Sequence, residues 1–269
     1  MLVCLHNSIT KRVCTSSKKV NKYCERIDRM LNSSTVTVRD LESLHGNLNY
    51  AAAVAPFARP FLVPLTEMIS KHRRDGLAPT TAAIKSSLRI WKKILAANKG
   101  LSFNFILDKL PRSNDIFTDA SSDWGIGGCH GPYYYLYSWD ELQAFHVDVI
   151  ARMELLAALI SLACFRDLIK GRYVQLFCDN SNVVSWLRKG RSSHRIGFRL
   201  LAVWELIKYK AQCKVSPQWL PGDKNCTADS LSRGVVPPWL RDRGRQVHCD
   251  LQRLAYYVTH AEESWDSIL

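Results

Sequence analysis

Four acidic residues stand at the ends or on the inner faces of predicted elements, where their side chains could meet. Asp119 and Asp179 each end a short apolar strand, Glu154 lies on the inner face of a helix, and Asp229 begins a short helix. Two strand ends and two helices can bring these carboxylates to one spot. Carboxylates without counter-ions repel one another and resist ionising together, so a cation is expected among them.

Magnesium is the cation that such a group favours, with manganese as the alternative. Mg²⁺ is a hard ion that takes oxygen ligands from a few carboxylates and from substrate phosphate. Two such ions about 4 Å apart can activate water and stabilise the leaving oxygen when a phosphodiester is hydrolysed. The residue types therefore predict two-metal hydrolysis of a phosphodiester.

Each acid also has a simpler explanation. Asp119 and the nearby Asp123 can be turn residues that bond local amides, and we take Asp123 as one. Asp179 can cap the following helix, and Asp229 can be favoured by the dipole of its own helix. Glu154 is harder to explain in this way, because it lies among leucines and a buried unpaired carboxylate is costly.

The elements around these acids alternate between short strands and helices. Strands are predicted over 116–122, 125–129, 133–139, 173–179 and 214–220, and helices over 151–169, 180–190, 195–211 and 227–233. Only short turns separate the first three strands, so we expect an antiparallel meander. This order predicts an α/β fold in which a mixed five-stranded sheet lies between helices.

Residues 1–114 have a different pattern and a different charge. Apolar residues recur there at helical spacing, a capping box begins at Thr37, and a later helix should end near Gly100, so we predict an all-helical segment. This segment holds 19 lysines and arginines and 7 acidic residues, a balance of +12, whereas residues 115–269 hold 18 and 17, a balance of +1. A polyanionic partner explains this asymmetry, and a solvated surface is the alternative.

Composition narrows the class of protein. The 269 residues are 47% hydrophobic, which is enough for one large core or two modest ones and too much for a disordered chain. No stretch approaches the roughly 20 apolar residues of a membrane span, and the first residues do not form a secretory signal. We therefore expect an intracellular, non-secreted protein with no membrane partner. The nine scattered cysteines support neither a disulfide framework nor a structural zinc site.

Four motifs resemble the ribonuclease H domain of reverse transcriptases from LTR-type and tyrosine-recombinase (DIRS-like) retrotransposons. They are FTDAS-x-x-x-GIGG (117–128), MELLAAL (153–159), FCDNSNVVSWL (177–187) and WLPGDKNCTADSLSR (219–233). Each motif alone is weakly specific, but four in the right order, each on the expected element, are a strong signal. The resemblance implies a ribonuclease H-like domain over 115–235 that uses two Mg²⁺ ions to cleave the RNA strand of an RNA/DNA hybrid. The implied metal-binding catalytic acids are Asp119, Glu154, Asp179 and Asp229.

The flanking segments extend this resemblance. TVRDLESLHGNLNYAAAVAPFARPFL (37–62) looks like the helical thumb and connection region that precedes ribonuclease H in the same polyproteins, and we assign residues 1–114 to it. The polymerase palm is not expected here, because the chain has no Y-x-D-D sequence. The polymerase part of a reverse transcriptase is therefore an expected partner. Residues 236–269 are predicted to be a C-terminal helical extension.

Residues that would bind nucleic acid are predicted around the helix that follows Asp179. Asn180 and Ser181 resemble residues with which the family contacts the backbone and the 2′-hydroxyl groups. A basic run at the end of that helix suits the phosphates of the uncut strand, and an ordinary solvated helix end explains it equally well. The run consists of Arg188, Lys189, Arg191, Arg195 and Arg199.

One departure from the family leaves activity open. Many relatives have a histidine in the loop before the last acid that helps product leave, whereas this chain has only Pro221-Gly-Asp-Lys-Asn225. We predict a metal-dependent endoribonuclease, with a catalytically weak or inactive nucleic-acid-binding relic of a retrotransposon polyprotein as the alternative. A transposase or integrase of the same fold fits less well. Its acids usually come as two aspartates and then a late glutamate, whereas the glutamate here is second.

Overall fold

The computed structural model describes residues 4–7, 12–74, 76–98, 100–102, 109–192 and 194–259. The chain divides into two compact units, the first over Met1–Asp108 and the second over Lys109–Ala261. Within the described ranges, no helix combines the length and the apolar character needed to cross a bilayer.

The first unit is built mainly from helices that bury one apolar face each. Its helices are α1 (Ser17–Leu31), α2 (Val38–Ala51), the 3-10 helix η1 (Pro56–Leu62), α3 (Val63–His72) and α4 (Ala82–Ala97). The predicted cap at the start of α2 is confirmed, because the Thr37 hydroxyl accepts the backbone N–H of Asp40 at 3.0 Å. α4 ends where predicted, at Asn98 in the left-handed conformation (φ 37°).

The prediction that this segment is all-helical is wrong. Short strands β1 (Cys4–Asn7), β2 (Arg12–Thr15) and β5 (Leu101–Ser102) form an antiparallel sheet, and β3 (Thr35–Thr37) pairs with β4 (Leu77–Pro79). These strands are two to four residues long, so they carry no recognisable alternation of apolar and polar residues. β3 and β4 are also separated in the sequence by α2, η1 and α3, and a local pattern cannot show such a pairing.

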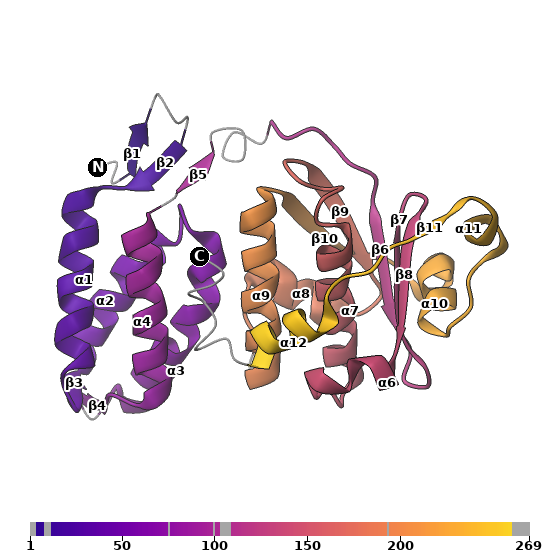
Figure 1. Ribbon diagram of the computed structural model, residues 1–269. Helices are drawn as coiled ribbons and strands as arrows, with labels where there is room; N and C mark the ends of the chain where they lie inside the picture. Colours follow the sequence, from indigo (N-terminus) through magenta and orange to yellow (C-terminus); the bar gives the residue numbers. More distant parts are fainter. Residues whose placement is uncertain are drawn as a thin grey trace. The chain divides into compact units, whose positions relative to one another are not determined.

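The second unit has a mixed six-stranded sheet in the order β10-β9-β6-β7-β8-β11 (Figure 1). The strands are β6 (Ile116–Ala120), β7 (Gly125–His130), β8 (Tyr133–Ser138), β9 (Tyr173–Cys178), β10 (Lys214–Trp219) and β11 (Arg245–Gln246). β6, β7 and β8 form the predicted antiparallel meander, and β9 and β10 run parallel to β6. The expectation of five strands missed β11, a two-residue strand parallel to β8.

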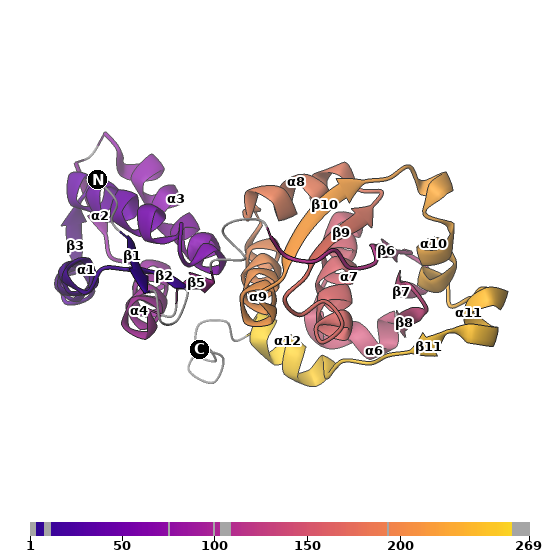
Figure 2. The ribbon, with the colours of Figure 1, turned by 90° about the horizontal axis from the view of Figure 1, so that it is seen from above.

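Helices cover both faces of this sheet (Figures 1 and 2). They are α6 (Trp139–Leu142), η2 (Gln143–Phe145), α7 (Ile150–Phe165), α8 (Ser181–Lys189), α9 (Arg195–Ala211), η3 (Gly222–Lys224), α10 (Cys226–Ser232), α11 (Pro238–Arg243) and α12 (Leu251–Thr259). α7 is buried almost all round, because it lies between the sheet and α9 in the main core. α10 packs on the opposite face, where Leu231 and Leu240 bury Cys129 in a smaller cluster.

A glycine in the second strand allows α10 to approach the sheet closely. A Cβ atom on Gly127 would overlap the side chain and backbone of Leu231 and the backbone nitrogen of Ser232. Both residues belong to α10, the helix that also carries Asp229. The glycine therefore sets how near this helix lies to β6 and β7.

We predict that Gly127→Ala lowers the free energy of unfolding by about 1–3 kcal/mol, because the added methyl group forces α10 away from the sheet. Gly46→Ala is the control, since Gly46 lies within α2 and a Cβ there would meet nothing within 4 Å. The control should be stabilising by up to about 1 kcal/mol, because alanine favours the helix. Chemical denaturation followed by circular dichroism measures both, and an unchanged stability for Gly127→Ala would contradict the close packing.

Candidate metal centre

Parallel pairing of β6 and β9 places two aspartates at the same edge of the sheet. Phe117 lies opposite Phe177 in this pairing, and the same register carried two residues further sets Asp119 level with Asp179. Asp119 is the last residue but one of β6 and is 6% exposed, while Asp179 directly follows β9 and is partly buried. The sheet therefore brings together two acids that are far apart in the sequence.

Glu154 reaches this edge from α7, on one face of the sheet. It is 4% exposed, and its carboxylate accepts the backbone N–H of Ala120 and lies 3.6 Å from the Cys178 thiol, which donates to it. One ligand atom from each of Glu154, Cys178 and Asp179 lies within 4.8 Å of the others. This trio is the most compact group of metal-ligand types in the described part of the chain.

Asp229 approaches from α10, on the other face. Arg233, one turn later, donates to Asp229 Oδ1 through Nε at 3.0 Å and Nη2 at 2.9 Å. Between them in the sequence, Ser232 donates its hydroxyl to Asp119 Oδ2 at 2.6 Å. α10 is therefore tied to β6 through one carboxylate and holds its own acid in an ion pair.

Burial and the charges of neighbouring acids raise the pKa values of Asp119, Glu154 and Asp179. Burial raises the pKa of Asp119 to about 6, and the charges of Asp179 and Asp229 add to the rise, while the Ser232 hydroxyl opposes it. Burial raises the pKa of Glu154 to about 9, with further contributions from Asp119 and Asp179. The pKa of Asp179 is also raised, first by burial and then by Asp229. All four predicted acids thus belong to one electrostatic group.

The four carboxylates do not form one compact ligand set. Asp119 and Asp229 lie outside the trio of Glu154, Cys178 and Asp179. Asp119 is directed to Ser232, and Asp229 is held by the exposed guanidinium of Arg233. The compact ligand set therefore consists of Glu154, Cys178 and Asp179, and Asp119 and Asp229 have partners of their own.

The donor set fits a hard divalent cation. The group offers carboxylate oxygens, which Mg²⁺ and Mn²⁺ prefer, and among the described residues Arg233 is the one basic group whose charge acts on these acids. Burial is the main reason that the pKa values of Asp119 and Glu154 are raised, and a divalent ion would offset the repulsion that adds to it. Cys178 is a soft donor, and burial raises the pKa of its thiol, so its role with a hard ion is to donate a hydrogen bond to Glu154.

Several residues of this site were not predicted from the sequence. Cys178 precedes Asp179, and strand alternation could have placed its side chain on the face toward α7. Ser232 and Arg233 lie three and four residues after Asp229, a helical spacing that could have indicated contact. Trp219 also lies beside these acids and was not predicted as a site residue. It is 54% exposed, and its indole N–H donates to the backbone oxygen of Asp179 at 2.8 Å.

The predicted nucleic-acid residues have different surroundings. The Asn180 side chain caps α8 by accepting the N–H groups of Asn182 and Val183, and Ser181 is exposed beside it. Arg188 donates to the backbone oxygen of Pro217 and to the side chain of Gln218.

The rest of the basic run is more open. Lys189 and Arg191 are exposed, and neither makes a hydrogen bond or an ion pair within the described residues. Arg195 begins α9, but its side chain lies outside the described part of the chain. Lys189 and Arg191 are therefore the residues of this run whose charges are available to a phosphate.

Comparison with protein-family models finds no match for this chain, and comparison with curated proteins finds none either. The function is therefore inferred from the four motifs and the geometry of this site.

We predict that the metal-free protein loses stability as the pH rises. Glu154 keeps its proton up to a pKa of about 9 when folded, whereas the unfolded chain releases it near the usual glutamate value. The folded state thus binds more protons between about pH 5 and pH 9, and the free energy of unfolding should fall by on the order of 1 kcal/mol per pH unit. Denaturant titrations in EDTA across this range measure the slope.

Glu154→Gln should remove most of that slope, because the amide cannot ionise. Asp140→Asn, at an exposed carboxyl of the same unit, should leave it unchanged. Addition of Mg²⁺ near pH 8 should raise the melting temperature of the parent protein. An equal slope in the parent and in Glu154→Gln would show that the buried acid is not the group that titrates.

Proposed function

We propose that this chain is a retroelement-derived ribonuclease H that hydrolyses the RNA strand of an RNA/DNA hybrid with two divalent metal ions. The observation that carries the proposal is the convergence of Asp119, Glu154, Asp179 and Asp229 into one electrostatic group. These are the acids that the resemblance assigns to metal binding, and each comes from a different element. A purely structural role does not explain why four acids from four elements share one edge.

The architecture supports the proposal in a second way. The second unit has the mixed sheet and flanking helices that the sequence pattern predicts, and the residues of the four motifs lie on these strands, helices and adjoining turns. The segment 37–62, which looks like the thumb and connection region, falls on α2 and η1 of the first unit. The chain would then work beside the polymerase part of a reverse transcriptase.

Some residues of the site would bind the metal ions, and others orient the acids. Glu154 and Asp179 present their carboxylates together, and Ser232 fixes Asp119 by holding one of its oxygens. Bound Mg²⁺ or Mn²⁺ would supply the Lewis acidity that makes water nucleophilic and stabilises the leaving oxygen. Arg233 is exposed, so a substrate or metal ion could displace it from Asp229 without disturbing the core.

A catalytically weak nucleic-acid-binding relic is the second candidate, and two observations favour it. The loop before Asp229 consists of η3 and Asn225 and has no histidine, and the Asp229 carboxylate is engaged by Arg233. In such a relic the fold and the basic segment would bind a hybrid without cleaving it. Cleavage is the measurement that separates the two candidates.

We predict that the protein cleaves a labelled RNA/DNA hybrid in Mg²⁺, and that Asp119→Asn and Asp179→Asn each lower kcat/KM by at least about 100-fold, or about 2.7 kcal/mol of transition-state stabilisation. Asp123→Asn is the matched control, because Asp123 is an exposed turn residue that accepts a hydrogen bond from Ser122. Its activity should stay within a few-fold of the parent. Activity that survives Asp119→Asn or Asp179→Asn contradicts the site, and an inactive parent that still binds the hybrid favours the relic.

Trp219 should bind substrate beside the acids. Its indole is exposed and fixed by Asp179, so it can stack on a base or sugar, a contact typically worth about 1–3 kcal/mol. Trp219→Ala should therefore raise the Kd for the hybrid about tenfold, whereas Trp239→Ala, at a similarly exposed tryptophan on α11, should not change it. Equal losses in both variants, or none in Trp219→Ala, would exclude stacking at this position.

A further inference from the structure

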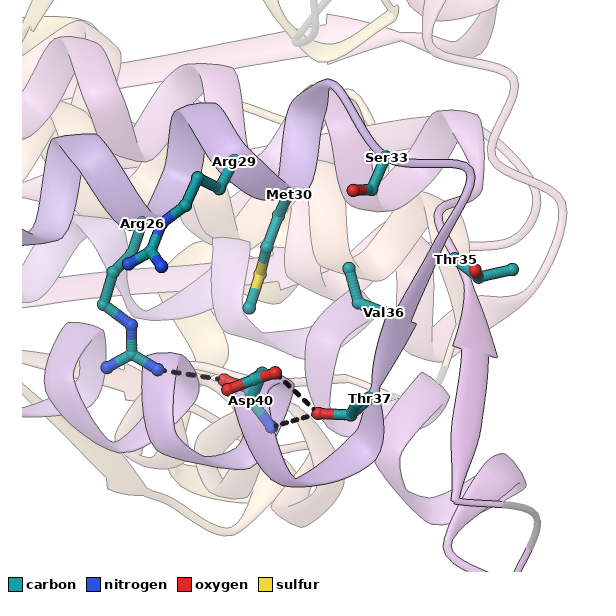
Figure 3. A pocket seen from close by; sticks show the side chains of 8 residues that line it. All are labelled: Arg26, Arg29, Met30, Ser33, Thr35, Val36, Thr37 and Asp40. Carbon is teal, nitrogen blue, oxygen red and sulfur yellow. Dashed lines mark hydrogen bonds between the residues drawn. The ribbon is translucent and has the colours of Figure 1, made fainter.

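A polar pocket of about 270 Å³ lies in the first unit, between the end of α1, strand β3 and the start of α2 (Figure 3). Met30 and Val36 provide its apolar part. Its polar lining consists of Arg26, Arg29, Ser33, Thr35, Thr37 and Asp40. The pocket belongs to no part of the candidate metal centre, which lies wholly in the second unit.

Two guanidinium groups face this pocket without an acidic partner. Arg26 and Arg29 are three residues apart on α1, so their side chains leave the same face of the helix (Figure 3). Arg26 donates to the backbone oxygen of Asp40 at 3.3 Å, and Arg29 has no hydrogen bond or ion pair in the described part of the chain. Two like charges held this close gain from an anion between them.

The one carboxylate in the lining is already engaged. Asp40 accepts the hydroxyl of Thr37 at 2.7 Å, and no ion pair among the described residues joins it to either arginine. The charged groups of the lining therefore sum to a net positive charge. The 14-residue helix α2 begins at Val38, and the positive end of its dipole adds to the attraction for an anion.

The lining chemistry matches a phosphate group. Arginine forks and hydroxyl groups are donors that bind phosphate oxygens, and Ser33 and Thr35 supply hydroxyls, whereas the Thr37 hydroxyl already donates to Asp40. The volume is below the roughly 300–1,000 Å³ of typical small-molecule sites, which suits one phosphate with part of its sugar rather than a whole cofactor. The net charge of +12 in residues 1–114 favours a phosphate that belongs to a molecule with many phosphates.

We propose that this pocket binds a backbone phosphate of a nucleic-acid strand, through Arg26, Arg29 and the hydroxyls of Ser33 and Thr35. This inference concerns binding and goes beyond the cleavage chemistry. It rests on the proposed function only where it assigns the phosphate to a nucleic acid. It gives the first unit a fixed contact with one phosphate, in place of a diffuse attraction between opposite charges.

Fluorescence anisotropy of the full chain with a labelled RNA/DNA hybrid tests the proposal. The titrations are made in EDTA, so that no cleavage occurs, and at several salt concentrations. Arg26→Gln and Arg29→Gln should each raise the Kd about five- to tenfold and lower the slope of log Kd against log salt by about 1, the effect of one lost phosphate contact. Arg89→Gln is the matched control, because Arg89 is exposed on α4 outside the pocket and without a partner among the described residues. It should change the Kd by less than about twofold.

Two further measurements separate a fixed site from general charge. Arg29→Lys should restore part of the lost affinity, because it keeps the charge and loses the planar fork. Inorganic phosphate, added at constant ionic strength, should compete with the hybrid for the parent protein and less for Arg29→Gln. Thermal melting of each variant checks its folding, and Arg29 is exposed, so its replacement should leave the fold intact.

Equal losses in Arg29→Gln and Arg89→Gln would overturn the proposal, since the charge would then act without a site. Unchanged hybrid binding in both pocket variants would overturn it as well, even if inorganic phosphate binds, because the phosphate bound there would not belong to a nucleic acid. The outcome is independent of cleavage. If the parent cleaves nothing but loses affinity with Arg26→Gln and Arg29→Gln, the nuclease proposal fails and the phosphate pocket stands.

Discussion

The burial of carboxylates beside one another is the constraint on which the second unit depends. Asp119 and Glu154 are nearly inaccessible to water, and their raised pKa values show that the fold keeps them where ionisation is unfavourable. A protein gains no stability from such an arrangement, because each charge must be neutralised or paired. The surrounding elements hold the acids at this edge in spite of that cost, which is characteristic of functional sites.

Helices on both faces of the sheet hold the acids in place. On one face, α7 is fixed by an apolar core, so Glu154 cannot move away without exposing its neighbours. On the other, α10 is brought close by Gly127 and joined to β6 through Ser232 and through Asn225, whose side-chain N–H donates to the backbone oxygen of Thr118 at 3.0 Å. Close packing and hydrogen bonds thus position the acids, and this preorganisation favours a metal site.

The two units differ in the charges that they carry. The second gathers acids at one edge of its sheet, whereas the first carries most of the excess positive charge and a pocket in which Arg26 and Arg29 have no acidic partner among the residues that the structure describes. Metal ions and phosphates are the partners that these two kinds of site favour, and a nucleic acid processed by metal-assisted hydrolysis brings both to one protein. The exposed Trp219 adds an aromatic surface beside the acids, suited to a stacked base.

The sequence by itself determined what local periodicity can encode. The helices α1, α2, α4, α7 and α9, the meander from β6 to β8, and the four acids at their elements all follow from apolar spacing, caps and short motifs. Only the tertiary structure decided which distant groups meet. It paired β3 with β4 and β11 with β8, turned Asp119 to Ser232, set Cys178 against Glu154, and opened the pocket between α1 and α2. The physical reason is that these contacts join residues that are far apart in the sequence. Strands of two or three residues are also too short to show a pattern from which their pairing could be predicted.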